Sequence, residues 1–195
     1  LSVSSAASDV YKRQQERFEI PDKFSTNHTE NFLYARTGYT GEDGVEIMAN
    51  NEDADSLLTF LTEKGIKQCG LVSRDKLRLE ASLPLYGFEL TEDITPVEAS
   101  LSWTLTNKND YLGSERINKQ LSGENHKVLK KFIIDSRKIA RTETVGIAGE
   151  TKGLVTSGNF SPILNKSIGF ILFENMPSQD LIEFDIRGNL IEGNI

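Results

Sequence analysis

The chain has 195 residues, a formal net charge of −7 and 37% hydrophobic residues. This length suffices for one large domain or two small ones with apolar cores, and the negative charge is opposite to that expected of a protein that binds a nucleic-acid backbone. No apolar run of the sequence approaches the roughly 18 residues that cross a membrane. We therefore expect a globular protein with neither a nucleic-acid nor a membrane partner.

The first 17 residues follow neither a helical nor a strand period. The stretch "LSVSSAASDVYKRQ" combines small polar residues with a mixed-charge end, and it lacks the apolar stretch of a signal peptide. We interpret residues 1–17 as a leader that is foreign to the fold or disordered, and we expect the true N-terminal part of the protein to be missing.

Residues 32–37 and 45–49 predict two short strands joined by a glycine-containing loop. A helix is expected from Asn51, because its apolar residues recur at helical spacing and Lys64-Gly65 supplies a stop signal. Residues 66–71 predict a returning strand. This order suggests part of a ferredoxin-like α+β sheet.

The middle of the sequence predicts two further helices, at residues 73–81 and 113–121. Between them, Leu101, Trp103 and Leu105 alternate as in a strand. Trp103 is expected in the core, because a single tryptophan more often packs in a core than serves as a surface on which a ligand stacks.

From residue 128, short β-like runs alternate with turn residues. The runs cover residues 131–134, 153–156, 168–173 and 181–186. Gly158-Asn159 is interpreted as a tight turn between strands. This pattern predicts a small antiparallel barrel or sandwich, with a domain boundary near residues 122–126.

Few residues of the sequence suit metal or thiol chemistry. Cys69 is the only cysteine, and the two histidines, His28 and His126, lie far apart. A zinc site is therefore not expected, and no metal ligand is assigned. Cys69 is interpreted as a buried small hydrophobe, and the lack of a disulfide partner favours a reducing, cytoplasmic location.

The loop of "ARTGYTGEDGVEI" (residues 35–47) carries three glycines and two acids, Glu42 and Asp43. These acids would repel phosphate, and they are too few and wrongly spaced for a calcium loop. The plain alternative is a hairpin with glycines at positive φ and solvated acids.

Two side chains near this loop suggest a binding role. Glu46 points to the strand face opposite that of its apolar neighbours, so Glu46 and Tyr39 could converge around a flat, guanidine-like heterocycle. On the next predicted helix, Arg74 and Arg78 share a face. They are interpreted either as surface ion pairs or as planar ligands for an anion or a ring.

Four blocks, in this order, resemble the T-protein (aminomethyltransferase) family of the glycine cleavage system. They are "ARTGYTGEDGVEI", "GLVSRDKLRLEASLPLYGFEL", "TPVEASLSWTL" and "GLVTSGNFSPIL". The resemblance covers residues 18–195. It implies an α+β fold with a partial folate-binding domain at 18–124 and a C-terminal antiparallel β-barrel at 127–195. The first of these would comprise a ferredoxin-like part at 18–70 and a central part at 71–124.

The resemblance also implies a reaction and a site. The family transfers a one-carbon unit from the aminomethyl-lipoyl group of H-protein to tetrahydrofolate and releases ammonia. By this resemblance, Glu46 would bind the pterin ring, and Tyr39 and Arg74 match the other signature positions. Tyr86 is expected to line the site, and Arg141 to be structural or adjacent to the folate.

The family's catalytic aspartate belongs to an N-terminal part that this sequence lacks, so no catalytic residue is assigned and the chain alone is expected to be inactive. Two alternatives stay open. One is a folate-dependent demethylase of the same superfamily, of the dimethylsulfoniopropionate or the dimethylglycine and sarcosine type. The other is a non-catalytic folate-binding relative.

Overall fold

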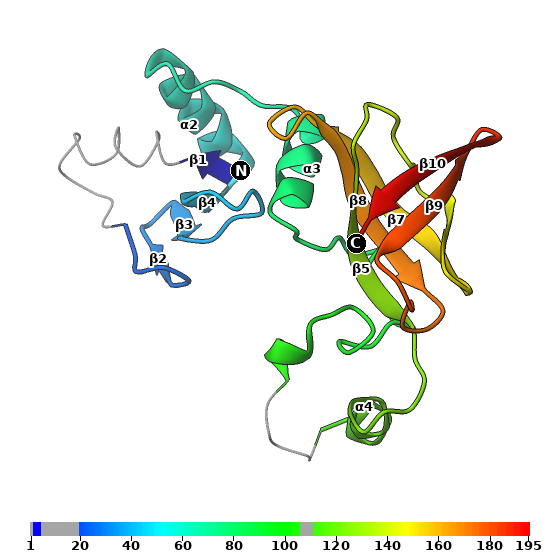
Figure 1. The fold of residues 1–195 in the computed structure, drawn as a ribbon. Coiled ribbons are helices and arrows are strands. Elements are labelled where there is room, and N and C mark those ends of the chain that lie inside the picture. The colour runs from blue at the N-terminus through cyan, green and yellow to red at the C-terminus, as the bar shows by residue number, and fades with distance from the viewer. Residues whose placement is uncertain (1, 5–19, 106–110) are drawn as a thin grey trace. The chain divides into compact units, whose positions relative to one another are not determined.

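The computed structural model describes residues 2–4, 20–105 and 111–195 (Figure 1). The chain divides into two compact units, Leu1–Leu83 and Pro84–Ile195. The domain limits expected from the sequence, 18–124 and 127–195, stay a prediction.

The first unit contains an antiparallel sheet with strand order β1-β4-β3-β2. Its strands are β1 (Ser2–Ser4), β2 (Thr26–His28), β3 (Phe32–Ala35) and β4 (Gly44–Ala49). The two strands predicted around the glycine loop are confirmed as the hairpin β3–β4. The short strand β1 lies within the predicted leader. The rest of that leader lies outside the described residues, so its interpretation stays a prediction.

Helix α2 (Asn51–Glu63) covers this sheet as the sequence predicts (Figure 1). Its buried Leu61 packs with Tyr34, Val45 and Ile47 in one apolar cluster. The strand predicted at residues 66–71 is wrong: residues 66–70 have no regular structure, and α3 (Leu71–Glu80) begins at once. The run is too polar and exposed to hold a strand in place, since Ile66 alone of it packs against the cluster.

Both helices predicted in the middle of the sequence are confirmed, as α3 and as α4 (Ser114–Leu121). The strand-like alternation between them is wrong, because residues Ser102–Thr104 form a 3₁₀ turn, η1. Trp103 is 81% exposed and therefore not a core residue. Cys69, expected to be buried, is also exposed.

The second unit contains the predicted barrel, which closes in the order β10-β5-β8-β7-β6-β9 (Figure 1). The strands are β5 (Val128–Ile134), β6 (Val145–Ala148), β7 (Thr151–Ser161), β8 (Lys166–Phe173), β9 (Leu181–Ile186) and β10 (Asn189–Asn194). Its interior is filled by apolar side chains; the rings of Phe132 and Phe184 lie 4.7 Å apart there, and Ile171 is fully buried.

Gly158 shows why one predicted turn is wrong. Gly158-Asn159 lies inside β7 rather than between two strands, and Gly158 pairs with Gly169 of β8. A Cβ at Gly158 would stand 1.8 Å from the carbonyl oxygen of Ala140. The glycine therefore serves a close approach of two backbones, which is the other common reason for glycine within a strand.

Candidate functional site

The loop between β3 and β4 lies against α3 within the first unit. Gly41, at the loop tip, has φ +77°, and a Cβ there would lie 2.6 Å from the Cβ of Ala81, the residue that ends α3. Any side chain at residue 41 would force the loop away from the helix. Of the three loop glycines, Gly41 alone has a positive φ, so that expectation is wrong for Gly38 and Gly44.

Tyr39 of the same loop also lies beside Arg74 of α3. The guanidinium carbon of Arg74, an exposed residue of α3, lies 4.8 Å from the centre of the Tyr39 ring. Among the described residues, Arg74 has no carboxylate within 4 Å. In this position the aromatic ring limits the orientation of the planar guanidinium. The N–H donors of the guanidinium stay available to a ligand.

The other arginine of the helix has a structural role. Arg78 is 2% exposed, and its Nε donates to Asp75 Oδ1 at 2.9 Å while its Nη1 donates to the carbonyl of Leu83 at 3.3 Å. The ion-pair interpretation therefore applies to Arg78, although this arginine is buried rather than on the surface. The interpretation as a ligand-binding residue remains for Arg74.

Glu46 lies on β4 between two buried neighbours, Val45 and Ile47, and is half-buried on the opposite face of the strand. Its Oε2 accepts a hydrogen bond from the hydroxyl of Thr37, at the start of the loop. The strand thus fixes the backbone, and Thr37 orients the carboxylate.

Asp43 is paired rather than simply solvated. Its two carboxylate oxygens accept hydrogen bonds from Arg36 Nε at 3.1 Å and Nη2 at 3.0 Å, a bidentate pair across the hairpin. The hydrogen bond from Arg36 lowers the pKa of Asp43, and the same pair raises the pKa of Arg36. Asp43 therefore closes the loop, and Glu46 is the acid that is better placed for a ligand.

Tyr86, in the second unit, is presented on a tight loop. Its side chain is 69% exposed. In the same loop, the fully buried Glu89 accepts a hydrogen bond from the amide of Leu85 at 2.9 Å and another from the hydroxyl of Thr156 at 2.6 Å. Thr156 belongs to β7, at the point where the register with β8 shifts. A strand irregularity thus anchors the loop that carries Tyr86.

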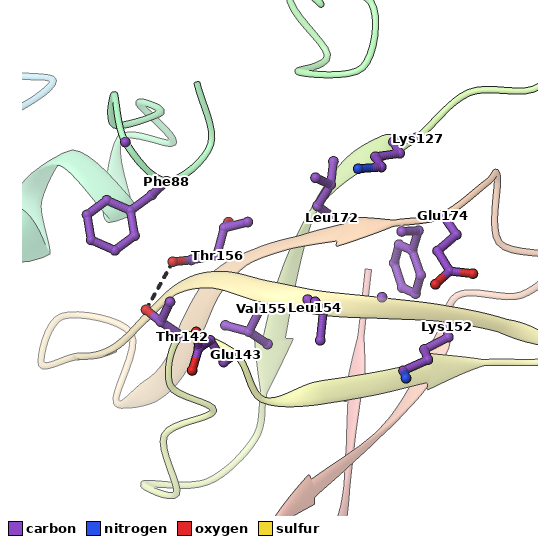
Figure 2. A pocket seen from close by; sticks show the side chains of 13 residues that line it. Phe88, Lys127, Thr142, Glu143, Lys152, Leu154, Val155, Thr156, Leu172 and Glu174 are labelled. Carbon is purple, nitrogen blue, oxygen red and sulfur yellow. Dashed lines mark hydrogen bonds between the residues drawn. The ribbon is translucent and has the colours of Figure 1, made fainter. Parts of the chain in front are cut away.

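A pocket of about 500 Å³ opens beside this loop (Figure 2). Gly87 and Phe88 of the loop line it together with residues of β7 and β8, among them Leu154 and Leu172. Its lining is mainly apolar, and it contains none of the five residues predicted as binding residues.

Arg141 lines a different pocket of the second unit, of about 480 Å³. The lining residues come from the loop between β5 and β6, from the adjoining ends of β9 and β10, and from the turn between those two strands: Arg137, Lys138, Ile139, Arg141, Thr144, Asp185, Ile186, Arg187 and Asn189. The sequence analysis does not single out the other basic residues. The run "RKIAR" offers a signal for Arg137 and Lys138, but Arg187 has none. Among the described residues, no group of three or more His, Cys, Asp or Glu side chains suits a metal ion, and no helix is long and apolar enough to cross a membrane.

Comparisons with known proteins agree with the fold. Residues 11–109 match a family model described as the GCVT N-terminal domain, GCV_T. An aminomethyltransferase of Corynebacterium aurimucosum is 43% identical over 162 residues, 78% of this chain and 44% of that protein. An aminomethyltransferase of a Geobacillus species is 40% identical over 189 residues, 91% of this chain and 51% of that protein.

A solved structure is similar over almost the whole chain. It is the crystal structure of glycine cleavage system aminomethyltransferase T from Bartonella henselae, with a TM-score of 0.85 and 26% identity over 97% of this chain and 55% of that one. The chain thus spans about half the length of the curated relatives it matches.

Proposed function

Because this chain belongs to the glycine cleavage T-protein (aminomethyltransferase) family, we propose that it takes part in one-carbon transfer to tetrahydrofolate. In this reaction the one-carbon unit of the aminomethyl group carried on the lipoyl arm of H-protein passes to tetrahydrofolate, and the amino group is released as ammonia. The proposed partners are therefore lipoylated H-protein and tetrahydrofolate, and the proposed location is the cytoplasm.

The observation that supports this proposal best is the placement of Glu46. A pterin presents a ring N–H beside an exocyclic amine, and one carboxylate can accept both hydrogen bonds. Glu46 stands half-buried on a strand with its carboxylate held by Thr37. Hydrogen bonds to a charged group contribute about 1.5–3 kcal/mol each, which is enough to select a pterin over a ring without these donors.

Arg74 and Tyr39 complete the proposed site in the first unit. The guanidinium, held at 4.8 Å from the tyrosine ring, can contact either a planar ring or an anionic group of the folate. Tyr86 and Arg141 belong to the second unit. They are proposed as further folate contacts on the family resemblance, with Arg141 structural or adjacent to the folate. No residue of this chain is proposed as catalytic.

The direct test is a fluorescence titration of the chain with tetrahydrofolate, using wild type, Glu46→Gln and, as a control, Glu42→Gln. The proposal expects saturable binding that is weakened by the substitution at residue 46 and not by that at residue 42. Binding that does not distinguish the two variants would refute the assignment of Glu46.

A second assay separates the reaction from its alternatives. This chain would replace the matching half of the Geobacillus aminomethyltransferase, and methylenetetrahydrofolate formation would be measured with aminomethylated H-protein as donor. Transfer from H-protein supports the proposal. Transfer from dimethylsulfoniopropionate, dimethylglycine or sarcosine instead would assign a demethylase, and folate binding without any transfer would assign a non-catalytic relative.

A further inference from the structure

The pocket around Arg141 has a charge opposite to that of the whole chain. Three guanidinium groups and one ammonium group line it, from Arg137, Lys138, Arg141 and Arg187, against a single acid, Asp185. The chain as a whole has a formal net charge of −7. Basic side chains are therefore concentrated here rather than spread evenly over a basic surface.

These basic side chains do not form ion pairs with the described carboxylates. Among the described residues, none of the four has a carboxylate within 4 Å. Arg137 instead lies over the ring of Phe160, with its guanidinium carbon 4.9 Å from the ring centre. Oδ1 of Asp185 accepts a hydrogen bond from the backbone amide of Gly188 at 2.8 Å, so part of the acceptor capacity of this carboxylate is used within the turn.

The loop that carries three of the four cations is held in place by backbone contacts. Its Glu143 amide donates to the carbonyl of Val155 at 2.8 Å, and its Thr144 amide donates to that of Arg141 at 3.0 Å. Ala140 is fully buried against the glycine at 158 of β7. A ligand would meet a prebuilt backbone here, which lowers the entropy lost on binding.

Arg187 adds a second, independent sign of function. It has φ +57° and is followed by Gly188 at φ +77°, in the two-residue turn between the paired residues Ile186 and Asn189. Such a turn favours Asn, Asp or Gly at both positions, and a long side chain with positive φ is strained. Strained residues concentrate at functional sites, and this one contributes a cation to the pocket.

We propose that this pocket binds a small oxyanion with two or more negative charges, of the phosphate or polycarboxylate kind. Guanidinium groups match the paired oxygens of both classes, whereas an ammonium acts as a point charge. The inference goes beyond the proposed function. Arg141 is also proposed to lie adjacent to the folate, but the anion site formed with Arg137, Lys138 and Arg187 requires neither folate nor H-protein, and its test uses neither.

The experiment is calorimetric titration of the full chain with pyrophosphate and, separately, with citrate, at constant ionic strength. The pocket variant is Arg141→Gln with Arg187→Asn. The matched control is Lys67→Gln with Lys131→Gln, which removes the same charge from exposed side chains outside the pocket. At least one anion is expected to bind at a single saturable site, with affinity at least tenfold lower in the pocket variant and unchanged in the control.

The two probes identify the class of anion, since stronger binding of pyrophosphate assigns a phosphate and stronger binding of citrate a polycarboxylate. No saturable binding of either probe, or an equal loss in both double variants, would overturn the proposal. Arg187→Asn alone guards against misfolding, because asparagine tolerates positive φ. It should unfold at the same or a higher temperature than wild type while binding the anion more weakly.

Discussion

Gly41 and Ala81 lie in direct contact, although one is in the β3–β4 loop and the other ends α3. A Cβ on Gly41 would come within 2.6 Å of the Cβ of Ala81. This contact places the loop against the helix, and in the same loop the Tyr39 ring lies 4.8 Å from the guanidinium carbon of Arg74. The loop glycine therefore shapes a candidate binding site through packing rather than by approaching a ligand itself.

Gly41→Ala is expected to destabilise the protein by about 1–3 kcal/mol, because it combines strain at positive φ with a steric clash. The matched control is Gly38→Ala: the atom nearest to the new Cβ would be the carbonyl oxygen of Glu42, at 3.9 Å, and the φ of Gly38 is not positive. Urea unfolding of both variants measures the difference. Adding Ala81→Gly should restore part of the loss at residue 41, and equal stabilities of the two single variants would contradict this account.

Glu46→Gln is expected to weaken tetrahydrofolate binding tenfold to a hundredfold, or about 1.4–2.8 kcal/mol. Glutamine keeps the size of the side chain and an oxygen that can accept from Thr37, but it loses the charge and one acceptor. The titration described above measures the change. The substitution should change the stability of the chain little. Circular dichroism of the same sample is the control, because it would reveal a loss of binding that is caused by unfolding.

The Tyr39–Arg74 contact is expected to have a coupling energy of about 0.5–1 kcal/mol, the range for an exposed cation–π pair. A double-mutant cycle with Tyr39→Leu and Arg74→Met measures it through unfolding free energies. Arg74→Lys keeps the charge but loses the planar group. The free energy of folate binding should therefore change more than the free energy of unfolding. Additive effects of the two cycle mutations would show that the contact contributes nothing to stability.

The local elements were predictable because their signals are local. The β3–β4 hairpin and α2 follow from alternation and helical spacing over short windows. The assignment of Tyr39, Glu46 and Arg74 as binding residues comes from the family resemblance and stays a prediction. The contact between Gly41 and Ala81 had no such signal, since it depends on how a loop and a distant helix pack.

The sequence-based predictions fail at residues whose role depends on the surrounding structure rather than on residue type. The sequence predicts a turn glycine at Gly158, but this glycine permits close backbone packing inside β7. Trp103 and Cys69 were expected in the core from their average burial, yet both are exposed. Asp43 was interpreted as a solvated acid because its pairing with Arg36 depends on hairpin register, which spacing alone does not specify.

The Arg36–Asp43 pair predicts a specific dependence of stability on pH. The pKa of Asp43 is lowered in the folded state, chiefly by the hydrogen bond from Arg36. Its stabilising contribution is therefore present above the unfolded pKa, about 3.9, and is lost as the pH falls through the lower folded value. Asp43→Asn should be less stable than wild type near neutral pH, and the two should converge below about pH 4.

Unfolding midpoints measured between neutral and acid pH test this dependence. In an Arg36→Gln background, Asp43→Asn should change the midpoint little at any pH, because the partner that lowers the pKa is gone. A pH-dependent difference that persists in that background would assign the effect to another group.

Thr156→Val tests the anchor of the loop that presents Tyr86. The hydroxyl of Thr156 donates to Glu89 at 2.6 Å, and Glu89 is fully buried. Valine has nearly the same shape but no donor, so the substitution should cost about 1–3 kcal/mol, the range for leaving a buried polar group without its hydrogen bond. Thr156→Ser keeps the hydroxyl and removes one methyl group, and it should cost less than about 1.5 kcal/mol.

The loop itself gives a second readout of this anchor. If the hydrogen bond holds the loop on β7, Thr156→Val should raise amide hydrogen exchange at Gly87 and Leu90, whose amide donates to Leu85 at 3.2 Å, more than in the barrel strands. Thr156→Ser should leave that exchange near the wild-type rate. Uniformly faster exchange throughout the barrel in Thr156→Val would instead mean that the threonine stabilises β7 as a whole, and Tyr86 would then owe its position to other contacts.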